Sequence, residues 1–117
     1  HTITVPFKVK PRPDGAQLAR EKLGAIVRQL TAEQAARDRL SDRPVVQIEG
    51  VLPKSPAETI GLRSGDILYQ LDRSYVSTLD DLGQLLERAR PGQRLYIRII
   101  RFVRGGYISA DTYIQVR

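Results

Sequence analysis

The sequence predicts a small α+β domain, a partly open antiparallel β-barrel or sandwich capped by two to three helices. Three observations lead to this fold class. Segments rich in β-branched and apolar residues outnumber those with helical spacing. Most connections between them are short. Residues 55–66, SPAETIGLRSGD, carry Pro56 where a helix can begin and Gly61 and Gly65 where it must end, which predicts a helix that turns directly into a strand.

The remaining elements follow from the same signals along the chain. Strands are expected where Val, Ile, Leu, Tyr and Thr dominate, at residues 2–9, 25–30, 45–52, 66–71, 94–103 and 108–116. Helices are expected at residues 16–22, 31–40, 53–60 and 77–89. Gly105 and Gly106 predict a hairpin turn between the last two strands.

Two of these helices start with a capping-box pattern, in which a Ser or Thr is followed three residues later by an acidic residue or an amide. Thr31 with Gln34 and Ser77 with Asp80 fit that spacing. In the last helix apolar residues recur three or four positions apart, which predicts one apolar face made of Leu79, Leu82, Leu85, Leu86 and Ala89.

Length and composition restrict the class of protein. The chain has 117 residues, which suits one domain, and no cysteine, which excludes disulfides and thiolate metal sites. No apolar run approaches the roughly 18 residues that a membrane helix needs, so no membrane insertion is expected. The formal net charge is +6, but the arginines are spread along the chain, which favours a solvated basic surface over a nucleic-acid-binding one.

No catalytic pattern is visible, so we expect a domain that is not an enzyme and needs no cofactor or metal. The single histidine is His1, whereas a Ser-His-Asp triad needs a buried, oriented histidine. Cysteine nucleophiles, His/Cys metal clusters and glycine-rich phosphate loops are absent from the sequence. Asp80 and Asp81 are neighbours on a helix and face different ways, so the helix dipole explains them better than catalysis does.

Several segments together resemble the PDZ domains attached to bacterial HtrA/Deg-type serine proteases. The segment 55–66 matches the central signature of that family, and Leu23-Gly24-Ala25-Ile26 resembles its carboxylate-binding loop. Residues 77–82 resemble the start of the helix beside the peptide groove. Pro91-Gly92, followed by a strand ending in Arg101, resembles the run before the last hairpin. The resemblance implies a PDZ-like fold with the bacterial, permuted strand order.

The resemblance also divides the chain. Residues 23–117 are expected to form the PDZ domain. Residues 1–22 are expected to hold an N-terminal strand and linker, the tail of a preceding domain, because residues 2–9 are similar in texture to the closing strand. The chain starts with His1 rather than Met, so we expect it to be a segment of a longer protein.

PDZ domains bind C-terminal peptides, so the resemblance implies a groove between the strand at 25–30 and the helix at 77–89. Backbone N–H groups of the loop would hold the ligand's carboxylate, and Gly24 would permit its close approach. The free edge of the strand would accept the peptide as an added antiparallel strand. The residues expected to bind peptide are Lys22, Leu23, Gly24, Ala25, Ile26, Val27, Leu79, Gly83 and Leu86.

These residues also have structural explanations that stay open. Leu23, Val27 and Leu86 suit a core, and Lys22 suits a surface. Gly83 costs about 1 kcal/mol in the middle of a helix, which a ligand approaching it would explain, and a glycine that the helix simply tolerates would explain it nearly as well. For specificity, the apolar Leu79 predicts an apolar residue at the ligand's third-from-last position. The small Ala25 predicts a wide terminal pocket that accepts Leu, Phe or Tyr.

The leading hypothesis is a non-catalytic module that captures C-terminal peptides or unfolded protein segments with an apolar terminal residue. It would regulate, or feed substrate to, a serine protease domain in the same chain, in the periplasm or envelope of a bacterium. Two alternatives stay open. The domain could dock another protein as a scaffold or secretion-type PDZ without a protease, or it could be a basic nucleic-acid-binding domain, which one contiguous arginine face would favour.

Overall fold

The computed structural model describes residues 14–117. The strand predicted at 2–9 lies outside these residues. Leu18 and Ala19, which precede the expected domain start at Leu23, belong to the same apolar core as the rest of the domain.

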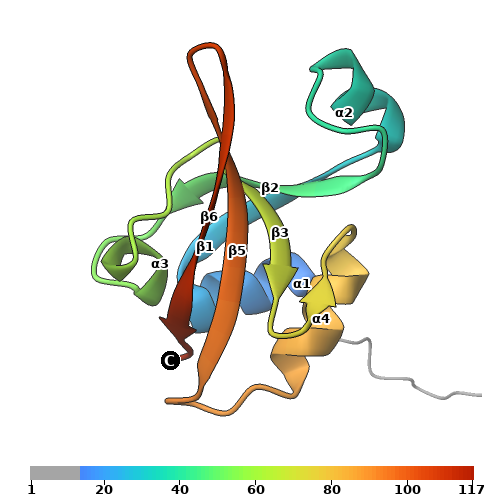
Figure 1. Ribbon diagram of the computed structural model, residues 1–117. Coiled ribbons are helices and arrows are strands. Elements are labelled where there is room, and N and C mark those ends of the chain that lie inside the picture. Colours follow the sequence, from blue (N-terminus) through green and yellow to red (C-terminus); the bar gives the residue numbers. More distant parts are fainter. Residues whose placement is uncertain (1–13) are drawn as a thin grey trace, which may run out of the picture.

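The described chain forms one open antiparallel sheet with helices packed around it (Figure 1). The predicted α+β, PDZ-like class is confirmed, although the sheet does not close into a barrel. The strand order is β1-β2-β3-β5-β6, with the short β4 paired to β3, so β1 and β6 are the two edges. The strands are β1 (Ala25–Leu30), β2 (Val45–Val51), β3 (Ile67–Leu71), β4 (Ser74–Tyr75), β5 (Arg94–Val103) and β6 (Gly106–Gln115).

The helices are short apart from the one before β5. Two of them, α1 and α4, pack together at one end of the sheet, and α2 stands at the opposite end (Figure 1). A π-helical turn, η1, continues α1 and leads directly into β1. The helical segments are α1 (Gly15–Leu18), η1 (Ala19–Leu23), α2 (Ala32–Arg37), α3 (Pro56–Thr59) and α4 (Leu79–Glu87).

The capping boxes were predicted correctly for α2 and one residue too early for α4. Thr31 and Gln34 cap each other as expected. At α4 the pair is Thr78 with Asp81: the Thr78 hydroxyl accepts from the Asp81 N–H at 3.1 Å, and the Asp81 carboxylate accepts from the Thr78 N–H at 3.2 Å. The sequence STLDD contains two overlapping frames with capping spacing, so local pattern could not choose between them.

Two further boundaries differ from prediction. Helix α2 ends at Arg37 instead of residue 40, because Arg39 takes a left-handed backbone conformation with φ of 57°. The final hairpin turn consists of Arg104 and Gly105, one residue earlier than predicted, because Gly106 already pairs with Val103 in the sheet. Only Gly105 needs a positive φ, of 90°.

Apolar residues fill both faces of the sheet. Neighbouring residues of a strand point to opposite faces, and accordingly Val46 and Leu68 join the main cluster under α1 and α4, whereas Val45 and Ile67 join a smaller cluster. The smaller cluster packs against Ala35 of α2. Helix α2 therefore covers part of the second face, and the rest of that face is available for other contacts.

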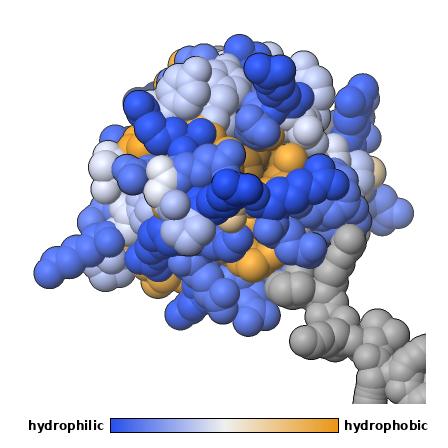
Figure 2. Space-filling view, turned by 90° about the horizontal axis from the view of Figure 1, so that it is seen from below, coloured by the Kyte–Doolittle hydropathy of each residue, from blue (hydrophilic) through white to orange (hydrophobic). Residues whose placement is uncertain are grey.

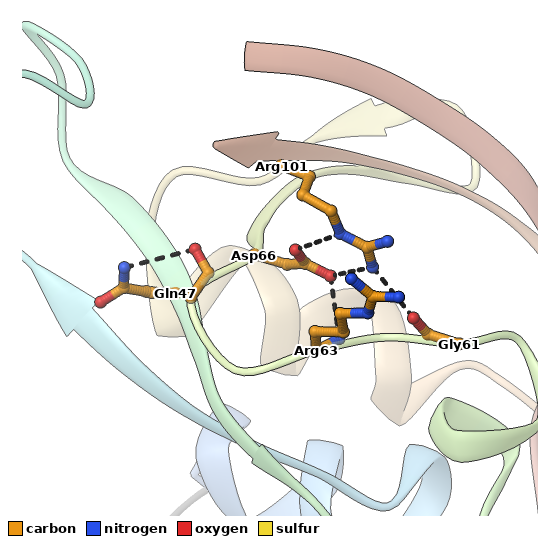
Figure 3. Close-up of polar contacts among 6 residues, drawn as sticks. Gln47, Gly61, Arg63, Asp66 and Arg101 are labelled. Carbon is orange, nitrogen blue, oxygen red and sulfur yellow. Dashed lines mark hydrogen bonds and ion pairs between the residues drawn. The ribbon is translucent and has the colours of Figure 1, made fainter. Parts of the chain in front are cut away.

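A buried ion pair holds the signature segment 55–66 against β5 (Figure 3). Asp66 is 2% exposed and accepts from the Arg101 guanidinium through both carboxylate oxygens, at 2.9 and 2.7 Å. The same guanidinium donates to the Gly61 carbonyl at 2.9 Å, and the Arg63 N–H donates to Asp66 at 2.9 Å. The carboxylate raises the pKa of Arg101, so the guanidinium stays protonated.

Candidate functional site

The expected peptide groove lies between the edge strand β1 and helix α4. Within residues 14–117, β1 pairs only with β2, so its other edge carries no strand. Ala25 and Val27 of β1 are buried in the main cluster, while Ile26 between them is half-buried. From α4, Leu86 and Gly83 are buried and Leu79 is half-buried. These are the residues that the sequence predicted for the two walls of a groove.

The turn at Gly24, just before β1, packs against Ser55 of the signature segment. Gly24 has φ of 75°, a left-handed conformation that favours glycine. A Cβ at this position would lie 2.1 Å from the Ser55 Cβ, so only glycine fits. Ser55 in turn accepts from the Glu58 N–H and donates to the Leu52 carbonyl. The sequence predicted the tight turn at Gly24 correctly. The close neighbour that requires a glycine here is Ser55 of the SPA motif, whereas the sequence predicted a ligand there.

The helical segment formed by α1 and η1 lies along α4 and leads into β1. A Cβ at Gly15 would lie only 2.0 Å from the Leu79 carbonyl oxygen and 3.0 Å from the Gly83 nitrogen. Leu18, Ala19 and Leu23 of the segment are buried in the same cluster as Leu86. The partner that Gly83 admits in this structure is therefore Gly15 of the chain itself.

The contacts of the segment extend over the whole of α4. Lys22, beside the expected carboxylate site, donates to the main-chain carbonyls of Leu86 and Ala89 at 2.5 and 3.0 Å. Lys22 thereby adds a charged donor to two carbonyls at the C-terminal end of α4, one of which, that of Leu86, also accepts from the Ala89 N–H. The start of α1 at Gly15 lies beside Leu79, and Lys22 near the end of η1 lies beside Leu86, so the segment runs parallel to α4. It is therefore antiparallel to β1, as an added peptide strand would be.

The other end of the groove is bridged by Gln29 of β1. Its side-chain oxygen accepts from the Leu79 N–H at 2.7 Å, and its amide nitrogen donates to the Ser77 carbonyl at 2.9 Å. This bridge fixes where α4 starts, and it explains why Thr78 is the N-cap rather than Ser77.

The expected carboxylate cradle is engaged within the chain. The Gly24 N–H donates to the Arg20 carbonyl at 3.1 Å, as the cap of η1. A ligand carboxylate would compete with this bond. The last turn of η1 must therefore change before Gly24 can present its N–H to a ligand.

Three residues of this region were missed in the sequence: Gly15, Leu18 and Gln29. Gly15, Leu18 and Ala19 have the three- and four-residue spacing of one helix face, so an amphipathic pattern was present in the sequence. Gln29 gives no such signal, because its partners in α4 are far away in sequence.

The surface near these helices offers little apolar area. Figure 2 views the molecule from below and shows small hydrophobic patches among mostly hydrophilic side chains. Among residues 14–117, no group of His, Cys, Asp and Glu is arranged to hold a metal ion. No helix in this part of the chain is long and apolar enough to cross a membrane.

Comparison with known proteins agrees with this geometry. A model of the PDZ domain family matches residues 47–101. One relative, a probable periplasmic serine endoprotease DegP-like from Hahella chejuensis, is 24% identical over 75% of this chain. Another protein of that name, from Pseudomonas putida, is 26% identical over 81% of this chain. The chain spans only 19% of the length of either relative.

Solved structures show the same likeness. The HtrA-type protease AlgW with a decapeptide superposes with a TM-score of 0.63 and 28% identity, over 81% of this chain and 29% of that one. The PDZ domain of a carboxy-terminal protease from Vibrio cholerae, in complex with a peptide, covers 82% of this chain and 92% of that one. Its TM-score is 0.57 and its identity 17%, so it supports the fold alone.

An open antiparallel sheet with an unpaired edge strand is the arrangement through which the PDZ class of binding modules adds a peptide strand. The family match and the relatives make the assignment more specific. The chain contains a PDZ domain of the HtrA/Deg type.

Proposed function

We propose that this domain captures C-terminal peptides by strand addition along β1, against α4. The observation that carries the proposal is the unpaired edge of β1, which starts at the left-handed Gly24 turn and faces α4. The decapeptide in the structure of the HtrA-type protease AlgW supports it. The binding residues would be those predicted from the sequence, with Ala25, Val27, Leu79 and Leu86 contacting ligand side chains.

Binding at this groove requires α1 and η1 to leave α4. Gly15, Leu18 and Lys22 occupy the positions beside α4 that the ligand needs. With an open groove, one buried side chain worth roughly 1.5–3 kcal/mol and a few strand hydrogen bonds support an affinity of roughly micromolar. A groove that is open about 1% of the time weakens the apparent affinity about a hundredfold. The segment therefore acts as an intramolecular competitor of the ligand.

A heteronuclear NMR titration of the labelled chain tests the proposal. The ligand is a peptide ending in Leu-Phe, used as the free acid and as its C-terminal amide. We expect shifts at residues 23–27 and 79–86 with the free acid only, accompanied by shifts at residues 15–22 as that segment moves. Shifts that are equal for acid and amide would contradict capture of the carboxylate.

A pair of substitutions sharpens the test. Leu79→Thr should lower the preference for an apolar residue at the third-from-last position of the ligand. Leu85→Thr is the matched control, because Leu85 is also half-buried on α4 but was not assigned to the groove. If both changes alter the preference equally, Leu79 has no specific role.

The covered groove favours a second candidate function, docking of a protein partner without delivery of substrates to a protease. Under this alternative α1 stays in place, and neither form of the peptide produces shifts at residues 23–27. We further propose that the domain regulates, or feeds substrate to, a serine protease domain in the same chain, because the relatives are named as endoproteases. Activity assays on the longer protein with and without this domain would test it.

We also propose a periplasmic or envelope location, since both relatives are named as periplasmic. Nucleic-acid binding is less favoured, because Arg101 is occupied by the ion pair with Asp66 and does not extend an arginine row along β5. Fractionation of cells that express the longer, tagged protein tests the location.

A further inference from the structure

A cleft of about 490 Å³ opens on the second face of the sheet, away from the peptide groove. Its floor contains Val45, Ile67 and Ile100, which belong to or pack against the smaller apolar cluster. One wall is the loop after α2, residues 39–44, and the other is the hairpin of β5 and β6. Figure 1 shows that this hairpin and α2 stand apart beyond the same end of the sheet.

Four aromatic side chains are exposed along this cleft. Tyr75 and Tyr107 are 64% and 66% exposed, and Tyr69 and Phe102 are 40% and 37% exposed. They form two pairs, with ring centroids 5.2 Å apart for Tyr69 and Tyr75 and 6.2 Å apart for Phe102 and Tyr107. Exposed aromatic groups gathered at a cleft are typical of interaction surfaces, because they offer a large contact area at a low entropic cost.

The charges along the cleft have one sign. Arg39, Arg43 and Arg98 line it, and no Asp or Glu does. Within residues 14–117 none of the three forms a salt bridge, but Arg98 lies opposite Asp111 in the β5–β6 register and interacts with Tyr96, so Arg39 and Arg43 are the two without a charged neighbour along the cleft. The Arg98 Nε is buried and has no hydrogen-bond partner among the described residues. Because this atom is buried, the attraction for an anionic ligand comes from the more accessible guanidinium groups along the cleft.

From the apolar floor, the aromatic pairs and the arginines that line the cleft, we infer that this cleft binds an extended segment of another protein in which acidic side chains alternate with aromatic or aliphatic ones. Carboxylates bind the arginines, and the apolar side chains pack on the floor and the aromatic rings. The cleft lies on the opposite face of the sheet from the β1–α4 groove, so this inference is independent of the proposed function.

A single-stranded nucleic acid is the other anionic polymer that stacks on aromatic rings. The aliphatic floor favours a peptide, because Leu40, Ile67 and Ile100 offer no polar group to a base edge. Leucine and phenylalanine side chains fill such a floor without leaving a polar atom unpaired.

Fluorescence anisotropy tests the inference with a labelled peptide in which Glu alternates with Leu and Phe. Its C-terminus is amidated, which removes the carboxylate that the β1–α4 groove would recognise. We expect the peptide to bind, with an affinity that falls at high salt. Arg43→Glu should weaken binding at least fivefold and Tyr75→Ser at least threefold.

Arg88→Glu is the matched control, since Arg88 is an exposed arginine at the end of α4, outside the cleft. It should change the affinity less than twofold. NMR shifts should fall at Tyr69, Tyr75 and Tyr107 and not at residues 23–27.

Several results would overturn the inference. They are no binding, equal binding of a peptide with Lys in place of Glu, or equal weakening by Arg88→Glu and Arg43→Glu. Tighter binding of an oligothymidylate of similar length would assign the cleft to nucleic acid instead. Concentration-dependent dimerisation that Tyr75→Ser abolishes, measured by sedimentation, would assign it to a second copy of this chain.

Discussion

Asp66 is a residue on which both the local turn and the tertiary packing depend. Its carboxylate accepts from the Arg63 N–H inside the signature segment and from Arg101 on β5. Because it is buried, the two charges hold each other in an environment where neither could remain alone. This pairing accounts for the final Asp of SPAETIGLRSGD and for Arg101 in physical terms.

Asp66→Ala should lower the free energy of unfolding by about 3 kcal/mol, because it leaves a partly buried guanidinium and a backbone N–H without partners. Chemical denaturation followed by circular dichroism measures this. Glu49→Ala is the control: the Arg28–Glu49 pair is 3.9 Å long and its side chains are about half exposed, 51% and 48%. That change should cost less than about 1 kcal/mol, and equal costs for both variants would contradict the argument.

Glycine residues have different roles at this scale. Gly24 needs a positive φ and also lies against Ser55, so both its backbone and its lack of a side chain are used. Gly15 has no such φ, and only the closeness of Leu79 excludes a side chain there. The first role is visible as a turn signal in the sequence, and the second depends on which helix packs against which.

At the level of elements, the start of α4 depends on contacts from β1. The Gln29 side chain forms hydrogen bonds with the backbone of Ser77 and Leu79. Thr78 and Asp81 form the capping box at the same helix end. The helix thereby presents Leu82 and Leu86 to the core.

Thr78→Ala should lower the free energy of unfolding by about 1 kcal/mol, the usual cost of losing an N-cap side chain. Ser77→Ala should cost less than about 0.5 kcal/mol, because no hydrogen bond of the Ser77 hydroxyl supports the helix in this structure. Thermal unfolding of the two variants compares them directly. The reverse order would place the N-cap at Ser77, as the sequence pattern first indicated.

The packing of α1 on α4 is the second contact between elements with a clear consequence. Replacement of Gly15 by Ala raises helix propensity by about 1 kcal/mol, which by itself would stabilise α1. The new Cβ would lie 2.0 Å from the Leu79 carbonyl, so the two helices must separate. We expect packing to outweigh propensity.

Gly15→Ala should therefore increase amide hydrogen exchange at residues 15–23 at least tenfold while β2, β3 and β5 stay protected. If the proposed function holds, the same change should tighten binding of the C-terminal peptide. Gly106→Ala is the control, since a Cβ there meets nothing within 4 Å. Unchanged hydrogen exchange in Gly15→Ala would show that α1 shifts enough to accommodate the new Cβ while it stays packed on α4.

At the scale of the whole molecule, the domain has two candidate binding surfaces, one covered by its own chain and one open. The β1–α4 groove, which the PDZ class uses for peptides, is filled by a helical segment of the same chain. The cleft on the opposite face of the sheet is open and lined by aromatic residues and arginines. The two surfaces can be tested separately, because an amidated peptide addresses one and a free C-terminus the other.

The sequence by itself determined the elements whose signals lie within a few residues. The SPAETIGLRSGD corner, the capping box of α2 and the glycine turn before β1 follow from local spacing, since their hydrogen bonds join near neighbours in the chain. The strands β1, β2, β3, β5 and β6 follow from their β-branched and apolar composition, although the hydrogen bonds between strands join distant residues such as Ala25 and Val51. The resemblance to PDZ domains could be seen in the sequence because the motifs that carry it are short, contiguous segments.

Only the tertiary structure decided the frame of the α4 cap, the role of Lys22 and the state of the groove. Each of these depends on a contact between distant residues: Gln29 with Leu79, Lys22 with Leu86, and Gly15 with Gly83. Local pattern allows a groove glycine to face a ligand or another helix equally well. Which of the two it meets is set by packing, because burial of Leu18 and Ala19 in the common core brings α1 onto α4.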